Sequence, residues 1–429
     1  MLHLQLDRSH HEGQGSRRAM DSGRILRALC LVLVLISVSM SPVAAESAVR
    51  IDEVIQLTDH TVYLNALDSD ESNVLAIGDD GVVLLIPPEQ PSGAEVLSPI
   101  TDEDLLAVDF HPAGNALIVG KSGEIIRYDH QDRRLSNVSG TGAVEISTLT
   151  AVSWNTNGAW AYISSDSGLI WRFRSLAEGN EIVPIENTRS SAVKAIDCHS
   201  IIRLCVVATE SDGIALIDSD HQISWIGGSS VIWTDVECAF GNNPDCVAVG
   251  SNQNLATIHL DDSIDGSSTM DAVVLSEAGG EFTHICAHSA DRLMVAMVPF
   301  GLIEHDVTKE DSFPWLDHAD IASTEDEIST RQVTCSWGTG TDDGWILNDR
   351  GRVARFVPDN EIDNPLISSI VGYALTVVIV ISVPGIVVGL IFMNSPSLQA
   401  MYNRWRRRRK GLEPSLKDRR EDRRRKRNS

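Results

Sequence analysis

The sequence predicts an all-β fold, a seven-bladed β-propeller whose N-terminal strand closes the last blade, followed by one C-terminal transmembrane α-helix. Residues 49–358 contain seven similar copies spaced about 44 residues apart. Each copy has short apolar strands separated by polar and glycine turns, and a lone apolar strand precedes the first copy. Fixed spacing with four short strands per copy is typical of propeller blades. A β-sandwich is the alternative, although it would not need seven matching units.

The clearest copy runs from Thr150 to Phe173 and reads TAVSWNTNGAWAYISSDSGLIWRF. The other copies begin at Asn65, Leu106, Lys194, Thr234, Thr283 and Gln332. The turn before the third strand of each copy holds Gly81, Gly123, Gly168, Gly213, Gly301 and Gly351, with Asn254 in the remaining copy. Glycine adopts positive φ freely and asparagine does so better than most residues, so we expect a tight turn at all seven positions.

The ends of the repeat region predict how the ring closes. The last copy supplies three strands before the chain leaves near Pro358, and Val49 to Leu57 (VRIDEVIQL) reads as a lone strand. We expect this strand to complete the last blade, because closure removes the free edges of the sheet.

Cysteines fall at matching places in the repeats. The ends of the first strands hold Phe110, Trp154, Cys198, Cys238, Cys286 and Cys335, and their expected partners across the hairpin are Ala116, Trp160, Cys205, Cys246, Leu293 and Gly344. Facing residues on antiparallel strands lie about 4.5–5.5 Å apart, so we predict the disulfides Cys198–Cys205 and Cys238–Cys246 and a Trp154–Trp160 pair. For Cys286 and Cys335 both a bond and two buried thiols are open, and we favour the thiols.

The repeat pattern V-x-[FWC]-x-x-x-G, followed by [AV]-x-[VI] and G-x-[IL]-x-[RF], resembles the WD-repeat and YVTN-type propeller superfamily. The third strands end in Tyr128-Asp129, Arg172-Phe173 or Ile217-Asp218 rather than Trp-Asp, so the chain is not a strict WD-repeat member. The resemblance implies a ring whose faces bind proteins, peptides or small ligands.

The flanking segments predict export and membrane anchoring. Residues 1–45 form an N-terminal extension and a signal peptide, with Arg24 and Arg27 before an apolar run and small residues up to an expected cleavage after Ala45; Met20 is an alternative start. Residues 46–360 form the extracytoplasmic propeller and 364–393 the transmembrane helix, in which 366–393 carry no charge. Residues 394–429 form a basic tail, which places the C-terminus in the cytoplasm.

Charge is divided along the chain in the same way. Residues 46–365 hold 16 Lys and Arg against 53 Asp and Glu, a net charge of −37, whereas residues 394–429 carry +10. The acidic segment repels nucleic acid, so nucleic acid is an unlikely partner. Its acids are scattered, which favours adaptation to a saline environment over cation binding. Six cysteines besides Cys30 are an even number, as expected in an oxidising exterior.

The sequence contains no common catalytic motif, and we predict no catalytic residue and no cofactor. Asp261, Ser263 and Asp265 resemble the start of a calcium loop, but Ala272 stands where the closing Glu belongs, so calcium is only a weak candidate. We expect His111 and His199, which follow the first strands of two copies, to be hydrogen-bonding turn residues.

Two basic blocks mark the tail. The first consists of Arg404, Arg406, Arg407, Arg408, Arg409 and Lys410. We favour a stop-transfer anchor with a disordered tail; the alternative is that the tail binds anionic lipid, cytoplasmic nucleic acid or an acidic protein. The function predicted is a non-enzymatic, membrane-anchored module that binds an extracytoplasmic protein or envelope component. The alternatives are a hydrolase or lyase with its site at the central channel, and a cation-dependent adhesin.

Overall fold

The computed structural model describes residues 47–70, 72–176, 179–263, 267–276, 278–316, 333–358, 390–411, 416–425 and 427. The expected signal peptide and residues 364–389 of the expected transmembrane helix lie outside these ranges. The chain divides into one compact unit that ends at Asp359 and a second that begins at Asn360. The two units are described separately.

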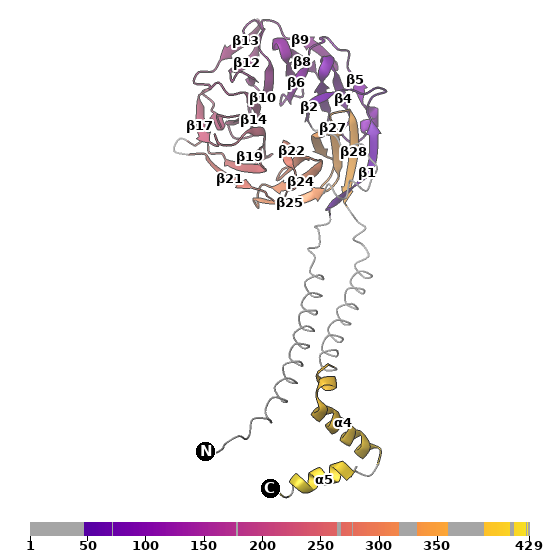
Figure 1. The fold of residues 1–429 in the computed structure, drawn as a ribbon. Helices are drawn as coiled ribbons and strands as arrows, with labels where there is room; N and C mark the ends of the chain where they lie inside the picture. The colour runs from indigo at the N-terminus through magenta and orange to yellow at the C-terminus, as the bar shows by residue number, and fades with distance from the viewer. Residues whose placement is uncertain are drawn as a thin grey trace, which may run out of the picture. The chain divides into compact units, whose positions relative to one another are not determined.

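The first unit consists of seven four-stranded antiparallel sheets arranged as the blades of a propeller (Figure 1). We number the blades in chain order by their first strands. Blades 1 to 3 comprise β2 (Leu64–Ser69), β3 (Val74–Gly78), β4 (Val83–Ile86) and β5 (Glu95–Val96); β6 (Leu105–Phe110), β7 (Ala116–Gly120), β8 (Ile125–Asp129) and β9 (Arg134–Asn137); and β10 (Leu149–Trp154), β11 (Ala161–Ser165), β12 (Ile170–Leu176) and β13 (Gly179–Pro184).

Blades 4 to 6 follow the same order of strands. They comprise β14 (Val193–Cys198), β15 (Cys205–Thr209), β16 (Ile214–Ile217) and β17 (Ile223–Gly227); β18 (Trp233–Cys238), β19 (Asp245–Gly250), β20 (Asn254–His259) and β21 (Thr269–Val274); and β22 (Glu281–Ser289), β23 (Arg292–Val298), β24 (Gly301–Asp306) and β25 (Asp311–Leu316). Short 3-10 turns lie at Asp79–Gly81, Pro91–Gly93 and Lys121–Gly123.

Blade 7 closes the ring as predicted. It comprises β26 (Val333–Gly338), β27 (Gly344–Asn348), β28 (Arg352–Pro358) and, as its outer strand, β1 (Val49–Gln56) from the start of the repeat region. β1 pairs antiparallel with β28, from Val49 opposite Pro358 to Gln56 opposite Arg352. The Val49 side chain is 1% exposed and packs with Trp315 and Phe356, so the closing strand shares the core of blades 6 and 7.

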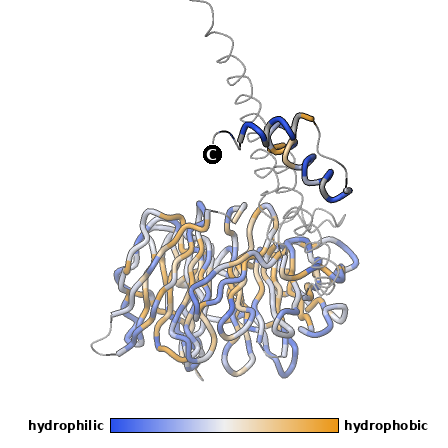
Figure 2. The backbone as a smooth tube through the Cα atoms, turned by 90° about the horizontal axis from the view of Figure 1, so that it is seen from below, coloured by the Kyte–Doolittle hydropathy of each residue, from blue (hydrophilic) through white to orange (hydrophobic). Residues whose placement is uncertain are grey.

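The first strands of the blades line the axis of the ring. They contact one another in cyclic order, from β2 through β6, β10, β14, β18 and β22 to β26 and back to β2. The apolar clusters lie between neighbouring blades; one, for example, joins Val206 and Leu216 of blade 4 to Trp233 and Val236 of blade 5. The strands of the ring are largely hydrophobic and the turns at their ends largely hydrophilic (Figure 2). Burial between blades therefore stabilises the ring.

The turn prediction is correct at five positions and wrong at two. Gly81, Gly123, Gly168, Gly213 and Gly351 have φ between 70° and 93°. At Gly213 a Cβ atom would stand 2.0 Å from the Gly227 carbonyl oxygen, so close backbone approach adds to the requirement for glycine. Asn254 instead begins β20, and the two residues before it, Asn252 and Gln253, have positive φ. Gly301 begins β24 and does not have positive φ. In these two blades the turn is displaced toward the second strand.

The pairing across the first hairpins is also partly as predicted. Phe110 faces Ala116, Cys198 faces Cys205 and Cys238 faces Cys246. Trp154 faces Ala161, however, because Trp160 lies in the turn before β11. The predicted Trp154–Trp160 pair is therefore wrong. The facing tryptophans are Trp337 and Trp345 of blade 7.

Three disulfides cross-link the second half of the ring. Cys198–Cys205 and Cys238–Cys246 join the first two strands of blades 4 and 5, with Cα–Cα distances of 3.9 Å and 3.8 Å. The third, Cys286–Cys335, joins β22 to β26, so the expectation of two free thiols is wrong. The two cysteines are not equivalent in register, since Cys286 faces Met294 and Cys335 faces Leu347. This offset places the two side chains across the boundary between neighbouring blades.

The second unit contains α4 (Pro396–Arg409) and α5 (Leu416–Arg425). Helices here contradict the expectation of a fully disordered tail. No helix in the described parts of the chain is long and apolar enough to cross a membrane. Residues 390–393, the last four of the predicted span, are helical.

Candidate functional site

Carboxyl groups occupy one position on the axis-lining strands. Asp68, Asp109, Asp197 and Glu237 stand at this position on β2, β6, β14 and β18, and all four are half-buried. Asp68 Oδ2 accepts a hydrogen bond from the Phe110 backbone N–H at 2.7 Å.

The same contact recurs around the ring. Asp109 Oδ2 accepts from Trp154 N at 2.5 Å and Asp197 Oδ2 from Cys238 N at 2.6 Å. In blade 3, Ser153 Oγ takes this place and accepts from Cys198 N at 3.1 Å. Each side chain therefore links one blade to the first strand of the next.

These carboxyls hold protons more tightly than usual. Burial raises the pKa of Asp68 to about 6 and that of Asp197 to about 7. Burial, with added repulsion from Asp68, raises the pKa of Asp109 well above its ordinary value, and burial with repulsion from Asp197 does the same for Glu237. A hydrogen bond between Asp68 and Asp109 lowers the pKa of Asp68 and raises that of Asp109.

The contacts of the axial carboxyls indicate that these groups link neighbouring blades. Three of them accept backbone N–H groups from the next blade. The described residues contain no group of three or more His, Cys, Asp or Glu that could hold a metal ion.

A second set of links joins the turns between the first and second strands. His111 Nε2 donates to Gly158 O at 3.0 Å and His199 Nε2 to Asn243 O at 2.6 Å, each in the next blade. The Nδ1 atoms accept backbone N–H groups of their own turns. The expectation that both histidines are turn-bracing residues is confirmed. Gly158 has φ +67° and would place a Cβ 2.3 Å from His111 Nε2, so this contact needs glycine.

A pocket of about 230 Å³ opens at this rim between blades 3 and 4. Its lining comes from the β10–β11 turn and β11, from the β14–β15 turn and β15, and from the end of β16. The lining residues are Asn155, Thr156, Asn157, Ala159, Trp160, Tyr162, Arg203, Cys205, Ile217, Asp218 and Ser219. Aromatic, amide, hydroxyl and charged side chains thus meet in one hollow, as is common in binding sites.

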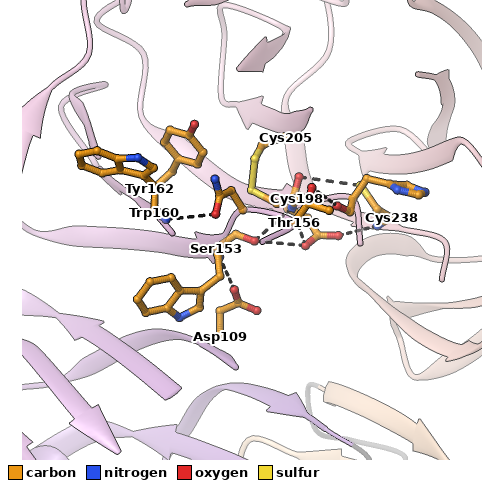
Figure 3. The surroundings of a disulfide bond; sticks show 12 residues. Asp109, Ser153, Thr156, Trp160, Tyr162, Cys198, Cys205 and Cys238 are labelled. Carbon is orange, nitrogen blue, oxygen red and sulfur yellow. Dashed lines mark hydrogen bonds between the residues drawn. A yellow bond between two sulfur atoms is a disulfide. The ribbon is translucent and has the colours of Figure 1, made fainter. Parts of the chain in front are cut away.

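The walls of the pocket are braced. Thr156 Oγ1 reaches the His199 and Ile202 carbonyl oxygens of blade 4, both at 3.0 Å. The Cys198–Cys205 disulfide closes the hairpin on the blade 4 side, close to Trp160 and Tyr162 (Figure 3). Bracing of this kind keeps the pocket formed before a ligand arrives, which lowers the entropic cost of binding.

Two arginines lie against the aromatic wall. The guanidinium carbons of Arg172 and Arg174 stand 4.8 Å and 4.3 Å from the centre of the Trp160 ring. Arg172 faces Tyr162 across β11 and β12, and Arg174 is two residues farther along the same face of β12. The His221 ring meets Trp160 edge-on, with centroids 5.0 Å apart. We call Trp160, Arg172, Arg174 and His221 the Trp–Arg cluster.

Electrostatics keep the neighbouring groups neutral. Tyr162 Oη lies 2.8 Å from His221 Nδ1. Burial, with Arg172 as the next cause, lowers the pKa of His221, and burial raises the pKa of Tyr162. At neutral pH the imidazole is therefore uncharged, and it shares a hydrogen bond with the neutral tyrosine hydroxyl. The positive charge at this wall belongs to the arginines.

The sequence-predicted cation site is only partly described. Asp261 Oδ1 accepts the Ser263 N–H at 2.9 Å, and hydrogen bonds from Ser263 lower the pKa of Asp261. Asp265 lies outside the described residues. The geometry that is described is that of a turn in which the Asp261 side chain satisfies its own backbone.

The predicted basic anchor belongs to the second unit. Arg404, Arg406, Arg407, Arg408 and Arg409 lie on α4, and Lys410 follows it. The Arg409 guanidinium carbon stands 5.1 Å from the centre of the Trp405 ring. The contacts described for this helix do not indicate which ligand it would bind.

Sequence reasoning missed the rim pocket. It assigned Trp160 to a cross-hairpin pair and did not single out Arg172 or Arg174. One signal was present: nine of the 16 basic residues in segment 46–365 fall between Lys121 and Arg203. Such clustering in a strongly acidic domain indicates a local surface of opposite charge.

Comparison with known proteins supports the architecture. No family model matches the chain, and no curated protein matches it. Among solved structures, the β-propeller domain of Cps50 (Swd1) from Myceliophteria thermophila has a TM-score of 0.56 at 10% identity, covering 72% of this chain and 99% of its own. YCF48 bound to D1 peptide has a TM-score of 0.55 at 12% identity, covering 75% of this chain and 100% of its own. At such identities the likeness shows the propeller fold alone.

Proposed function

We propose that this chain is a membrane-anchored, extracytoplasmic β-propeller that binds a protein partner through the pocket between blades 3 and 4. The pocket itself is the observation that carries the proposal. Its lining combines the aromatic side chains Trp160 and Tyr162 with Arg203, and two more arginines lie against Trp160. Aromatic residues and arginine are enriched where proteins bind proteins. YCF48, a propeller of similar fold, was solved with a bound peptide, and propeller rims are suited to such contacts.

The extracytoplasmic location is supported by sequence and by chemistry. The residues before the ring have the pattern of a signal peptide, and an uncharged run followed by a basic tail comes after it. All six cysteines of the ring are paired in disulfides, which persist in oxidising compartments.

The places where the chain enters and leaves the ring are consistent with a tether on the rim that carries the pocket. In an antiparallel sheet, the end of the third strand lies on the same rim as the turn between the first and second strands. β28 is a third strand and ends at Pro358 opposite Val49. The chain therefore enters and leaves the ring at the rim that carries the pocket, so an anchor after residue 358 would hold this rim.

Photo-crosslinking in the native cell tests the proposal. A benzophenone amino acid replaces Ala159, which is exposed and lines the pocket, and in a matched variant it replaces Asp166, exposed on the opposite rim of the same blade. We expect a discrete protein adduct from position 159 and none from position 166. Adducts of equal yield at both positions, or at neither, would contradict the proposal.

A further inference from the structure

We propose that the partner enters this pocket as an acidic peptide segment and that one of its carboxylates binds Arg172, which lies against Trp160 of the pocket wall. The inference rests on the proposed function and names the chemistry of the partner. The observations behind it are the charge partners of Arg172, Arg174 and Arg203, the contacts of the Trp160 ring and the amide groups of the rim.

Arg172 differs in its charge partners from Arg174 beside it and from Arg203 of the pocket lining. Arg174 Nη2 stands 2.5 Å from Glu181 Oε2, and Arg203 Nε stands 3.7 Å from Asp262 Oδ2. No carboxylate in the described parts of the chain lies within ion-pair distance of Arg172, which lies over the Trp160 ring. A guanidinium that lies over an aromatic ring can still donate hydrogen bonds to a carboxylate.

The aromatic wall favours an anion over a stacked sugar or ring. Trp160 is already in contact with two guanidinium groups and with the edge of His221. A ligand at this wall therefore meets the guanidinium groups rather than a bare indole face. Burial, with Arg172 as the next cause, lowers the pKa of His221, so the positive charge at this wall stays on the guanidinium groups.

The amide side chains of the rim add hydrogen-bond donors. Asn155 Oδ1 accepts the Trp160 N–H at 3.1 Å, and Asn157 Oδ1 accepts the Ala159 N–H at 2.9 Å. With the oxygens so engaged, Nδ2 is the remaining polar atom of each side chain, and both residues line the pocket. Donors beside a guanidinium match the oxygens of a carboxylate.

One acid of the lining could oppose this preference. Asp218 Oδ1, however, accepts the backbone N–H groups of Asp220 and Gln222 at 2.9 Å and 2.8 Å. The Asp218 carboxylate is therefore engaged by its own turn. Residues 46–365 carry a net charge of −37, and the electrostatic field of this charge repels anions. An acidic peptide that binds must therefore do so through local contacts.

Peptide binding by the full-length protein in detergent tests the inference. The probe is a fluorescein-labelled peptide of six glutamates, and the comparison probe has six glutamines. We expect the glutamate peptide to bind at least about tenfold more tightly, and Arg172→Gln to remove about tenfold or more of that affinity, as loss of a charge-assisted contact should. Arg134→Gln, an exposed arginine of β9 with the same charge change, should alter it less than about twofold.

Arg172→Lys guards against a folding artefact, because it keeps the charge and much of the packing but loses the planar fork. It should bind with intermediate affinity and melt like the wild type. Equal binding of the two peptides, or equal loss in Arg172→Gln and Arg134→Gln, would overturn the inference. If such a result came with adducts from position 159, the carboxylate would be wrong and the pocket right; without adducts, both proposals would fail.

Discussion

Asp109 shows how one side chain serves both structure and electrostatics. Its Oδ2 accepts the Trp154 N–H of the next blade at 2.5 Å, and its side chain is hydrogen-bonded to Asp68. Asp197 and Glu237, on other axis-lining strands, also have raised pKa values. A carboxyl whose folded pKa exceeds its unfolded value binds protons more tightly when folded. The stability that such a carboxyl adds is full below about pH 4 and is lost as pH rises through its folded pKa, which is about 6 for Asp68 and about 7 for Asp197.

Asp109→Asn should therefore stabilise the protein at neutral pH. The amide keeps an oxygen for Trp154 and presents N–H to Asp68, so it mimics the protonated acid without its charge. We expect the free energy of unfolding at pH 7.5 to rise by about 1 kcal/mol, and its decline between pH 4.5 and 7.5 to become shallower. Urea unfolding across that range measures both.

Asp109→Ala is the control for this prediction, because it leaves the buried Trp154 N–H without its acceptor. It should destabilise the protein by about 1–3 kcal/mol at every pH. If Asp109→Asn were as unstable as Asp109→Ala at pH 7.5, the negative charge of Asp109 would not destabilise the folded state.

Hairpins and disulfides are the elements that the sequence predicted best. The pairs Cys198–Cys205 and Cys238–Cys246 follow from strand register, which is local. Cys286–Cys335 joins different blades, and register within one repeat says nothing about contacts between repeats. Removal of this bond gives a prediction at the same scale.

The double variant Cys286→Ser/Cys335→Ser should lose more stability than Cys238→Ser/Cys246→Ser. The two bonds span 49 and 8 residues, and the chain-entropy relation gives losses of about 4 and about 2.5 kcal/mol. Chemical unfolding under non-reducing conditions compares the two variants. A larger loss from the blade 5 bond would show that the link between blades does not restrain the unfolded chain.

The site was less predictable than the fold, for a physical reason. The repeat pattern reports strands, turns and burial, which depend on neighbours in sequence. Trp160 and Arg172 come together with His221 and Arg203 only because blade 4 packs beside blade 3. The displaced turns before β20 and β24 show the same limit, since the repeat alone does not fix where an irregular turn ends.

At the scale of the whole molecule, closure by β1 should decide whether the ring folds as one unit. Val49 packs with Trp315 and Phe356 across blades 6 and 7, so Val49→Asp would bury an unpaired charge. We expect a loss of about 3 kcal/mol or more, with the cooperative urea transition broadened. Arg50→Gln, at an exposed position next to it, should stay within about 0.5 kcal/mol of the wild type. Similar behaviour of the two variants would contradict the closure of the ring by β1.

The location of the ring outside the cytoplasm is the claim on which the tether, the disulfides and the proposed partner all depend. Thiol trapping in intact cells tests it most directly: acid quenching, alkylation of free thiols, reduction, then a second, heavier alkylating reagent. Mass spectrometry should find the heavier reagent on Cys198, Cys205, Cys238, Cys246, Cys286 and Cys335, because all six are paired in disulfides and disulfides persist in an oxidising compartment. If these cysteines carried the first reagent instead, the ring would reside in a reducing compartment and the account would be contradicted.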